Sequence, residues 1–155
     1  MKCYILIGGV GSGKSTYAKE KAKDGWIIIN DDALVNAVHA DQYLLYNKCF
    51  KPLYKGIEAA VFSHAVALNV NIVIDRTNLD PETRKRYVCM CRAFDVKDII
   101  AVVFPMVSPE EHALRRFNSD SRGVSLEKWT EIAKYHFSMW KEPSLEEGFS
   151  EIIKL

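Results

Sequence analysis

The stretch that decides how this chain is interpreted is Ile5–Ala22, ILIGGVGSGKSTYAKEKA. It begins with consecutive apolar residues, becomes rich in glycine at Gly8 and continues with residues typical of a helix. Its middle satisfies the pattern G-x-x-x-x-G-K-[ST], in which a strand leads into a loop and the loop into a helix. We therefore expect the backbone amides of this loop, with the N-terminus of the helix, to form a binding site for an anion.

The residues of this loop have separate expected roles. Glycine adopts backbone angles that other residues avoid and lets amide groups approach a ligand closely. Lys14 is expected to reach the β- and γ-phosphates of a nucleoside triphosphate, and the Ser15 hydroxyl is expected to ligate Mg²⁺. We expect ATP as the phosphoryl donor. The predicted nucleotide-binding residues are Gly8, Gly11, Ser12, Gly13, Lys14, Ser15 and Thr16.

Apolar runs alternate with helical patterns along the rest of the chain. Consecutive apolar positions, rich in Ile and Val, are typical of strands that are covered on both faces. The alternation predicts an α/β fold with a mainly parallel sheet and helices on both faces. Ligands of such folds bind at the carboxyl ends of the strands. The predicted strands are Cys3–Gly8, Trp26–Asn30, Asn71–Asp75, Ile99–Phe104 and Glu151–Leu155.

Six helices are predicted between these strands, and several carry recognisable start signals. Asp80 and Ser108 are expected to cap helices whose first residue is proline. In the longest helix, we expect Leu53, Ile57, Val61 and Leu68 to lie roughly on one apolar stripe. The predicted helices are Lys14–Lys23, Asp32–His39, Pro52–Asn69, Pro81–Phe94, Pro109–Phe117 and Ser125–Trp140.

Length and composition favour a soluble protein with one domain. We expect residues 1–155 to form a single domain, because 155 residues suffice for one real core. The net charge of +1 gives no general signal for nucleic acid, so any contact with a phosphate backbone must come from local basic clusters. The four cysteines lack the paired spacing of zinc or redox sites and are expected to be reduced and mostly buried. No apolar run is long enough to cross a membrane, so we expect a cytoplasmic protein without a membrane partner.

Acidic and polar residues follow two of the predicted strands. Asp31 and Asp32 follow the second strand, where a carboxylate can accept or orient the proton of a hydroxyl near the γ-phosphate. The alternative is that these residues, with Asn30, only cap the next helix. We favour Asp32 as the general base.

Asp75 ends the third strand in a Walker-B-like pattern. It is expected to hold Mg²⁺ through water or to brace the phosphate loop. Thr77 and Asn78 follow as polar groups at the mouth of the strand. A capped turn is the alternative interpretation. We expect the basic run 84–86, which comes next, to be a solvated helix face.

A second basic cluster, around Arg115, Arg116 and Arg122, is interpreted as a lid at about residues 115–125. In small phosphotransferases such a lid brings arginines onto the transferring phosphate and excludes water. Arg122 is the first choice, because it lies in the least regular and most polar part. The four histidines are scattered, and we interpret them as surface or core residues rather than ligands.

Four stretches, in this order along the chain, resemble the kinase domain of polynucleotide 5′-hydroxyl kinases, within the wider P-loop kinases. They are GGVGSGKSTYA, INDDAL, VIDRTNLDPETRKRY and RRFNSDSRGV. The resemblance spans nearly the whole chain, and the ending EPSLEEGFSEIIKL is also similar to animal-type kinase domains. It implies a three-layer P-loop kinase fold with five strands and a small lid.

The resemblance also implies roles for particular residues. INDDAL is similar to an Asn-Arg-Asp segment whose last residue is the general base, which places the base at Asp32 and puts Asp31 where arginine is usual. VIDRTN is similar to an Ile-Asp-x-Thr-Asn segment whose polar residues lie near the active centre. The arginine that precedes glycine in the lid segment is Arg122. Val35 stands where phage enzymes carry an arginine that binds nucleic-acid phosphate.

Three functional hypotheses follow. The first is a kinase that transfers the γ-phosphoryl group of ATP to the 5′-hydroxyl of DNA or RNA. The second is a related kinase for a modified base in DNA, a nucleoside or another small alcohol, and the changes at Asp31 and Val35 motivate it because they remove positive charge from the acceptor side. The third is a nucleotide-binding switch without catalysis. No Asp-x-Asp-Gly-Thr phosphatase signature is present, and the oligomeric state stays open.

Overall fold

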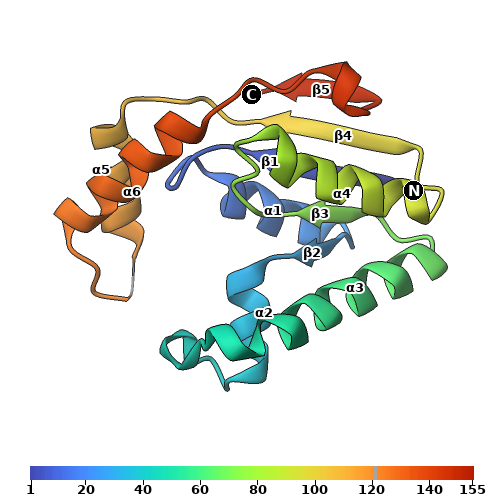
Figure 1. The fold of residues 1–155 in the computed structure, drawn as a ribbon, viewed down its shortest axis with the longest axis horizontal. Helices are drawn as coiled ribbons and strands as arrows, with labels where there is room; N and C mark the ends of the chain where they lie inside the picture. Colours follow the sequence, from blue (N-terminus) through green and yellow to red (C-terminus); the bar gives the residue numbers. More distant parts are fainter. Residues whose placement is uncertain (121) are drawn as a thin grey trace.

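A five-stranded sheet forms the centre of the computed structural model, which describes residues 1–120 and 122–155 (Figure 1). Its strand order is β2-β3-β1-β4-β5, and each of these neighbouring pairs is parallel. The predicted α/β fold is therefore confirmed, and each predicted strand end lies within one residue of the observed one. The strands are β1 (Lys2–Ile7), β2 (Ile27–Ile29), β3 (Ile72–Ile74), β4 (Asp98–Val103) and β5 (Glu151–Lys154).

Helices cover both faces of the sheet, which confirms the predicted three layers. On one face, Phe62 of α3 (Lys51–Ala67) and Tyr87 of α4 (Pro81–Ala93) join the alternate strand residues that include Ile5. On the other face, α1 (Lys14–Lys23) packs through Ala18 against a cluster that contains Leu6 and Val73. Because successive residues of a strand point to opposite faces, β1 contributes to both cores.

Two further groups of elements lie toward the carboxyl ends of the strands. The helices α5 (Pro109–Ser119) and α6 (Leu126–Met139) pack together through Ala113, Trp129 and Ala133 and stand away from the sheet (Figure 1). The predicted lid, 115–125, covers the end of α5 and the connection to α6; Ser121 within it lies outside the described residues. On the other side, α2 (Asp31–Val38) and the short 3₁₀ helices η1 (Tyr43–Leu45) and η2 (Lys48–Phe50) lead into α3.

Local signals fix the helix starts where they were expected. Asp80 accepts a hydrogen bond from the backbone N–H of Thr83 at 2.9 Å, and Ser108 accepts one from Glu111 at 3.2 Å. Proline is the first residue of both helices. Such caps satisfy amide groups that have no partner within the helix.

The expected apolar stripe of α3 is wrong by one position. Leu53 and Leu68 are 52% and 75% exposed, and the buried face of the helix instead carries Glu58 between aromatic residues. A carboxylate on the inner face hides the true pattern, since hydrophobic periodicity counts Glu58 as a surface residue. The buried residues of α3 are Tyr54, Glu58, Phe62 and Ala65.

The basic run at the start of α4 is a solvated face, as predicted, at Lys85 and Arg86, but the prediction is wrong for Arg84. Arg84 is completely buried, forms an ion pair with Glu147 (Nε to Oε2, 2.6 Å) and donates to the carbonyl groups of Asn78, Leu79 and Lys141. Its partner Glu147 belongs to η3 (Leu145–Glu147), just before β5. Arg84 therefore ties the loop after β3 to the C-terminal segment.

Cys3 and Cys91 are buried, whereas Cys49 and Cys89 are exposed, so the expectation of mostly buried thiols holds for half of them. All four are free. Within the described part of the chain, no helix combines the length and the apolar character needed to span a bilayer.

Candidate active site

The phosphate loop connects β1 to α1 at the carboxyl edge of the sheet. Gly11 and Gly13 have φ angles of 67° and 96°, in the left-handed region that favours glycine. At Gly11 a Cβ atom would also lie 2.5 Å from the carbonyl oxygen of His112 in α5, so no side chain fits there. The loop is therefore packed directly against the backbone of the lid helix.

Lys14 is buried inside this loop. Its Nζ donates to the Gly9 carbonyl at 2.5 Å and to Ser12 Oγ at 3.1 Å. Burial lowers the pKa of Lys14 to about 8; Arg116 adds to the effect and Asp75 opposes it. The side chain is thus largely an ammonium at neutral pH, and phosphate oxygens can replace Gly9 and Ser12 as its acceptors.

Asn30 joins the carboxyl ends of β2 and β3. Its amide nitrogen donates to Asp75 Oδ2 at 2.9 Å, and its amide oxygen caps α2 by accepting from Ala33. The cap of α2 is therefore Asn30, so Asp31 and Asp32 lie in the first turn of the helix with their carboxylates free for other contacts. The alternative that the two acids only cap this helix does not apply.

The two acids of α2 take different partners. Asp31 forms an ion pair with Arg76 at 2.6 Å, whereas Asp32 lies 3.5 Å from Arg122 of the lid. The Asp32 side chain is 53% exposed, so a substrate hydroxyl can reach it. Asp32 therefore faces Arg122 of the α5–α6 connection, whereas Asp31 faces the end of β3.

Two lid arginines rest on one aromatic ring. The guanidinium groups of Arg116 and Arg122 lie 5.0 and 5.4 Å from the centre of the Trp129 ring. Arg122 also lies 5.1 Å from the Tyr43 ring, and its Nε donates to Asp120 at 3.1 Å. These contacts hold two positive charges beside the phosphate loop.

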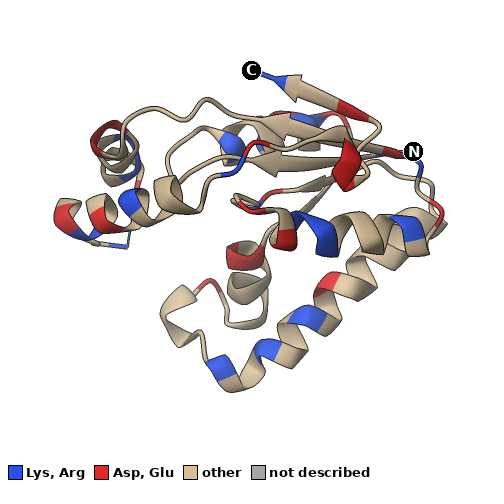
Figure 2. Ribbon diagram, turned by 45° about the horizontal axis from the view of Figure 1, so that its top comes forward, with Lys and Arg blue, Asp and Glu red and all other residues tan. Residues whose placement is uncertain are grey.

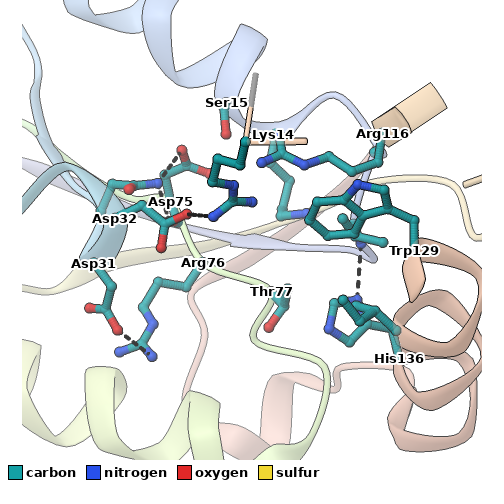
Figure 3. Close-up of a pocket in the computed structure, with 15 residues that line it drawn as sticks. Lys14, Ser15, Asp31, Asp32, Asp75, Arg76, Thr77, Arg116, Trp129 and His136 are labelled. Carbon is teal, nitrogen blue, oxygen red and sulfur yellow. Dashed lines mark hydrogen bonds and ion pairs between the residues drawn. The ribbon is translucent and has the colours of Figure 1, made fainter. Parts of the chain in front are cut away.

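These residues enclose a cavity of about 330 Å³ at the carboxyl ends of the strands. Figure 3 shows Asp31, Asp32 and Asp75 on one side of it and Arg116, Trp129 and His136 on the other. Of the predicted site residues, it is lined by Gly11, Lys14, Ser15, Asp31, Asp32, Asp75, Thr77, Arg116 and Arg122.

The remaining predicted residues do not line this cavity. Gly8, Ser12, Gly13 and Thr16 belong to the loop or to the start of α1 but lie outside the lining. Asn78 is buried and donates to the Leu6 carbonyl at 2.8 Å, so it braces β1. Arg115 points away, pairing with Glu111 on the exposed surface of α5.

Six lining residues were not predicted as site residues: Val10, Asn30, Arg76, Trp129, Ile132 and His136. Arg76 follows Asp75 directly, so its place after a strand could have revealed it. His136 Nδ1 accepts the backbone N–H of Val10 at 3.1 Å, and His112 lies against Gly9. Both histidines thus support the phosphate loop, which isolated histidines in a sequence do not indicate.

Oxygen donors suited to Mg²⁺ are present in the cavity. The Ser15 hydroxyl and the Asp75 carboxylate both line it, and Mg²⁺ prefers such ligands together with phosphate oxygens and water. The described residues contain no cluster of three or more Asp, Glu, His or Cys side chains able to hold a metal. This donor set fits an ion that arrives with a nucleotide and keeps several waters.

The parallel sheet, the phosphate loop and the lid define an α/β protein with the P-loop kinase fold. More particularly, a family model described as an AAA domain matches residues 4–132, and the chain belongs to this family. No curated protein matches the sequence.

Three solved structures share the fold. The chain is similar to a gluconokinase from Sinorhizobium meliloti 1021, with a TM-score of 0.60 and 16% identity over 99% of this chain and 81% of that one. It is similar to a chain of the Pnkp1/Rnl/Hen1 complex, with a TM-score of 0.63 and 24% identity over 80% of this chain but only 40% of that one. It is also similar to Kti12 from Chaetomium thermophilum, solved with ADP-AlF3, with a TM-score of 0.57 and 15% identity over 99% and 88% of the two chains. At these identities the likenesses establish the fold.

Proposed function

We propose that this chain is an ATP-dependent kinase, formed as one domain by residues 1–155, that transfers the γ-phosphoryl group to the 5′-hydroxyl of DNA or RNA. The proposal rests on one observation. Arg122 Nη1 lies 3.5 Å from Asp32 Oδ2, and both side chains line the cavity next to the phosphate loop. A base and a phosphate-binding arginine are the two groups that such a transfer needs next to the γ-phosphate.

In the proposed reaction, Asp32 accepts the proton of the acceptor hydroxyl as its oxygen attacks the γ-phosphorus. The bond from the γ-phosphorus to the bridging oxygen breaks, and ADP leaves with that oxygen. Lys14 and the lid arginines Arg116 and Arg122 bind the phosphate oxygens on which negative charge is concentrated. Mg²⁺, held by Ser15 and through water by Asp75, would neutralise part of the phosphate charge.

A small neutral alcohol or a nucleoside is the second candidate acceptor. Val35, which stands where the resembling phage enzymes carry arginine, is buried and apolar, so α2 supplies no cation at that position. Both candidates use the same donor site and the same base, so only the acceptor distinguishes them.

The test follows radiolabel from γ-labelled ATP into a panel of acceptors. The panel contains 5′-hydroxyl DNA and RNA oligonucleotides, a 5′-phosphorylated oligonucleotide, duplex DNA with hydroxymethylated bases, and free nucleosides. Asp32→Asn is compared with Asp95→Asn, an exposed position with a φ of 57° that asparagine tolerates.

We expect label only on the 5′-hydroxyl oligonucleotides. Asp32→Asn should lower the rate about 10²- to 10⁴-fold, because general base catalysis contributes that much. Asp95→Asn should react like the wild type. Label on nucleosides or modified bases would establish the second candidate. Label on no acceptor would refute the kinase proposal, and an active Asp32→Asn would refute the base.

A further inference from the structure

A second cavity, of about 580 Å³, opens on the other side of Asp31 and Asp32. Asp31, Asp32 and Arg76 line both this cavity and the one at the phosphate loop. The two cavities therefore adjoin at Asp32, the proposed base. We call it the acceptor chamber and define it by six of its lining residues: Tyr46, Lys51, Tyr54, Lys55, Arg76 and Arg86.

The wall formed by α3 and α4 carries three cations, Lys51, Lys55 and Arg86, against two carboxylates, Glu82 in the lining and the buried Glu58 in α3. Lys55 and Arg86 share one carboxylate, that of the buried Glu58, at 3.2 and 2.5 Å. Lys51 forms no ion pair with any residue that the structure describes. Burial and the charge of Arg76 lower the pKa of Lys55, as expected where cations are crowded. Figure 2 shows basic positions along the N-terminal part of α3.

Arg76 balances the charge of Asp31, the acid that stands where the resembling enzymes carry arginine. It leaves the end of β3, pairs with Asp31 at 2.6 Å and donates to the Tyr87 hydroxyl at 2.8 Å. Tyr87 in turn donates to Glu58 at 2.8 Å. Asp31 and Arg76 therefore form a fixed neutral pair. Lys55 and Arg86 share only one carboxylate, and Lys51 has no ion pair among the described residues, so these three cations are the ones available to an anion.

Aromatic rings complete the chamber. The rings of Tyr43, Tyr46 and Tyr54 stack in sequence, with centroids 6.4 and 5.6 Å apart. Tyr54 is buried, whereas Tyr46 is 40% exposed and offers part of its surface to a ligand. Nucleobases stack on such rings without regard to sequence.

We propose that the acceptor chamber binds the terminal nucleotide of the acceptor, with the phosphate on its 3′ side against Lys51, Lys55 and Arg86 and its base against Tyr46. This proposal rests on the proposed kinase function for the placement of the hydroxyl at Asp32. It assigns phosphate binding to α3 and α4, because α2 carries Val35 instead of a cation. The substrate class that follows is a nucleotide unit that carries a phosphate, not a neutral alcohol.

The first experiment changes the acceptor and leaves the protein intact. A 5′-hydroxyl tetrathymidylate with fluorescein at its 3′ end is compared with the same probe bearing a neutral methylphosphonate at the first linkage. Fluorescence anisotropy gives both dissociation constants, and transfer from γ-labelled ATP gives both KM values. We expect the neutral probe to bind about tenfold more weakly, since one hydrogen-bonded charge contributes about that much.

The second experiment changes the wall of the chamber. Lys51→Met is chosen because Lys51 has no ion pair among the described residues whose loss would disturb the fold. The exposed Lys85, which does not line the chamber, supplies the control Lys85→Met. We expect Lys51→Met to weaken binding of the charged probe several-fold, to leave the neutral probe unchanged and to leave the KM for ATP unchanged. Lys85→Met should change none of these values.

The base is tested with Tyr46→Leu and with a probe that lacks its first base. We expect each to weaken binding, and the two changes together to weaken it no more than either alone. Full additivity would show that the base lies elsewhere and would overturn that part of the proposal.

The outcomes separate this proposal from the proposed function. Transfer to the 5′-hydroxyl with equal affinity for both probes would keep the kinase and overturn the phosphate site. Tighter binding of the charged probe, lost in Lys51→Met, would support the site even without transfer, and the kinase proposal alone would fail. Equal weakening of both probes by Lys51→Met would also overturn the site.

Discussion

The two sides of the active-site cavity hold their charged groups by different means. On the lid side, Arg116 and Arg122 lie over the Trp129 ring and both pair with Asp120, at 3.6 and 3.1 Å. A cation is attracted to an aromatic face anywhere within about 6 Å of the ring centre, so this contact constrains direction less than a hydrogen bond does. The lid side thus holds its charges in a manner that allows rearrangement around a phosphate.

On the acceptor side, the charged groups form one continuous chain of contacts. It runs from Asp31 through Arg76 and Tyr87 to Glu58, at 2.6, 2.8 and 2.8 Å. Hydrogen bonds weaken steeply with distance and angle, so this chain fixes its members. The comparison teaches that the proposed acceptor side is held by a longer chain of hydrogen bonds than the proposed lid side, so we expect the lid side to rearrange more readily when a nucleotide binds.

The largest effect is expected from the lid. Arg122→Ala should lower kcat about 10³-fold, because an arginine that neutralises the transferring phosphoryl group contributes at least that much. The KM for ATP should change less than about threefold, since Lys14 and the loop amides remain. Steady-state kinetics, with the acceptor that the labelling experiment identifies, gives both values.

Arg115→Ala is the matched control, because Arg115 lies on the same helix but pairs with Glu111 outside the cavity. It should retain nearly full activity. Similar rates for the two variants would contradict the assignment of Arg122 to the reaction.

On the proposed acceptor side, the expected effect of a substitution is on the free energy of unfolding. Burial opposes ionisation of Glu58, but hydrogen bonds from Tyr87 and Arg86 and the charges of Arg86 and Lys55 outweigh it, so its pKa is lowered. Glu58→Gln should lower the free energy of unfolding by about 2 kcal/mol, because it removes the buried carboxylate that accepts from Tyr87 and pairs with the partly exposed Lys55 and Arg86. Urea unfolding at neutral pH measures the change.

Glu111→Gln, which removes the exposed partner of Arg115, should change the unfolding free energy by less than about 0.5 kcal/mol. If Glu58→Gln had as small an effect as this control, the chain of contacts on the acceptor side would not be rigid.

A stability effect that is confined to acidic pH, and absent at neutral pH, is expected from His136. Burial, with the charges of Lys14 and His112, lowers the pKa of His136 to about 4, whereas an unfolded histidine titrates near 6.5. The unfolded state therefore binds the proton first, so stability should fall as the pH drops from about 6.5 to about 4. His136→Gln, which keeps an acceptor for the Val10 amide, should flatten this part of the curve, and the exposed His64→Gln should not. Thermal unfolding of both variants between pH 4 and pH 7 measures this. Equal pH dependence of the wild type and His136→Gln would show that His136 does not contribute to the loss of stability in acid.

Much of the fold could be predicted, because its signals are local. Buried parallel strands appear as apolar runs, and Asp80 and Ser108 mark helix starts through contacts within three residues. The phosphate loop has the same advantage, since its function depends on consecutive residues. The stripe of α3 failed because Glu58 is buried by partners that lie far away in the sequence.

The candidate site could be predicted only where strand ends or a family motif pointed to it. Asp32, Asp75 and Arg122 line the cavity as expected. Trp129 and His136 are seven residues apart and so lie on one face of α6, and nothing in the sequence shows that this face packs against the phosphate loop. Their placement follows from the packing of α5 against α6, which sequence periodicity does not reveal.

The buried Arg84 has a consequence for how this chain can diverge. Its guanidinium needs Glu147 and three carbonyl groups, so a substitution at either end of the ion pair leaves a charge stranded in the core. Homologous sequences are therefore expected to change positions 84 and 147 together, although 63 residues separate them. Covariation between these two positions would indicate that the C-terminal segment and α4 have evolved as one folding unit.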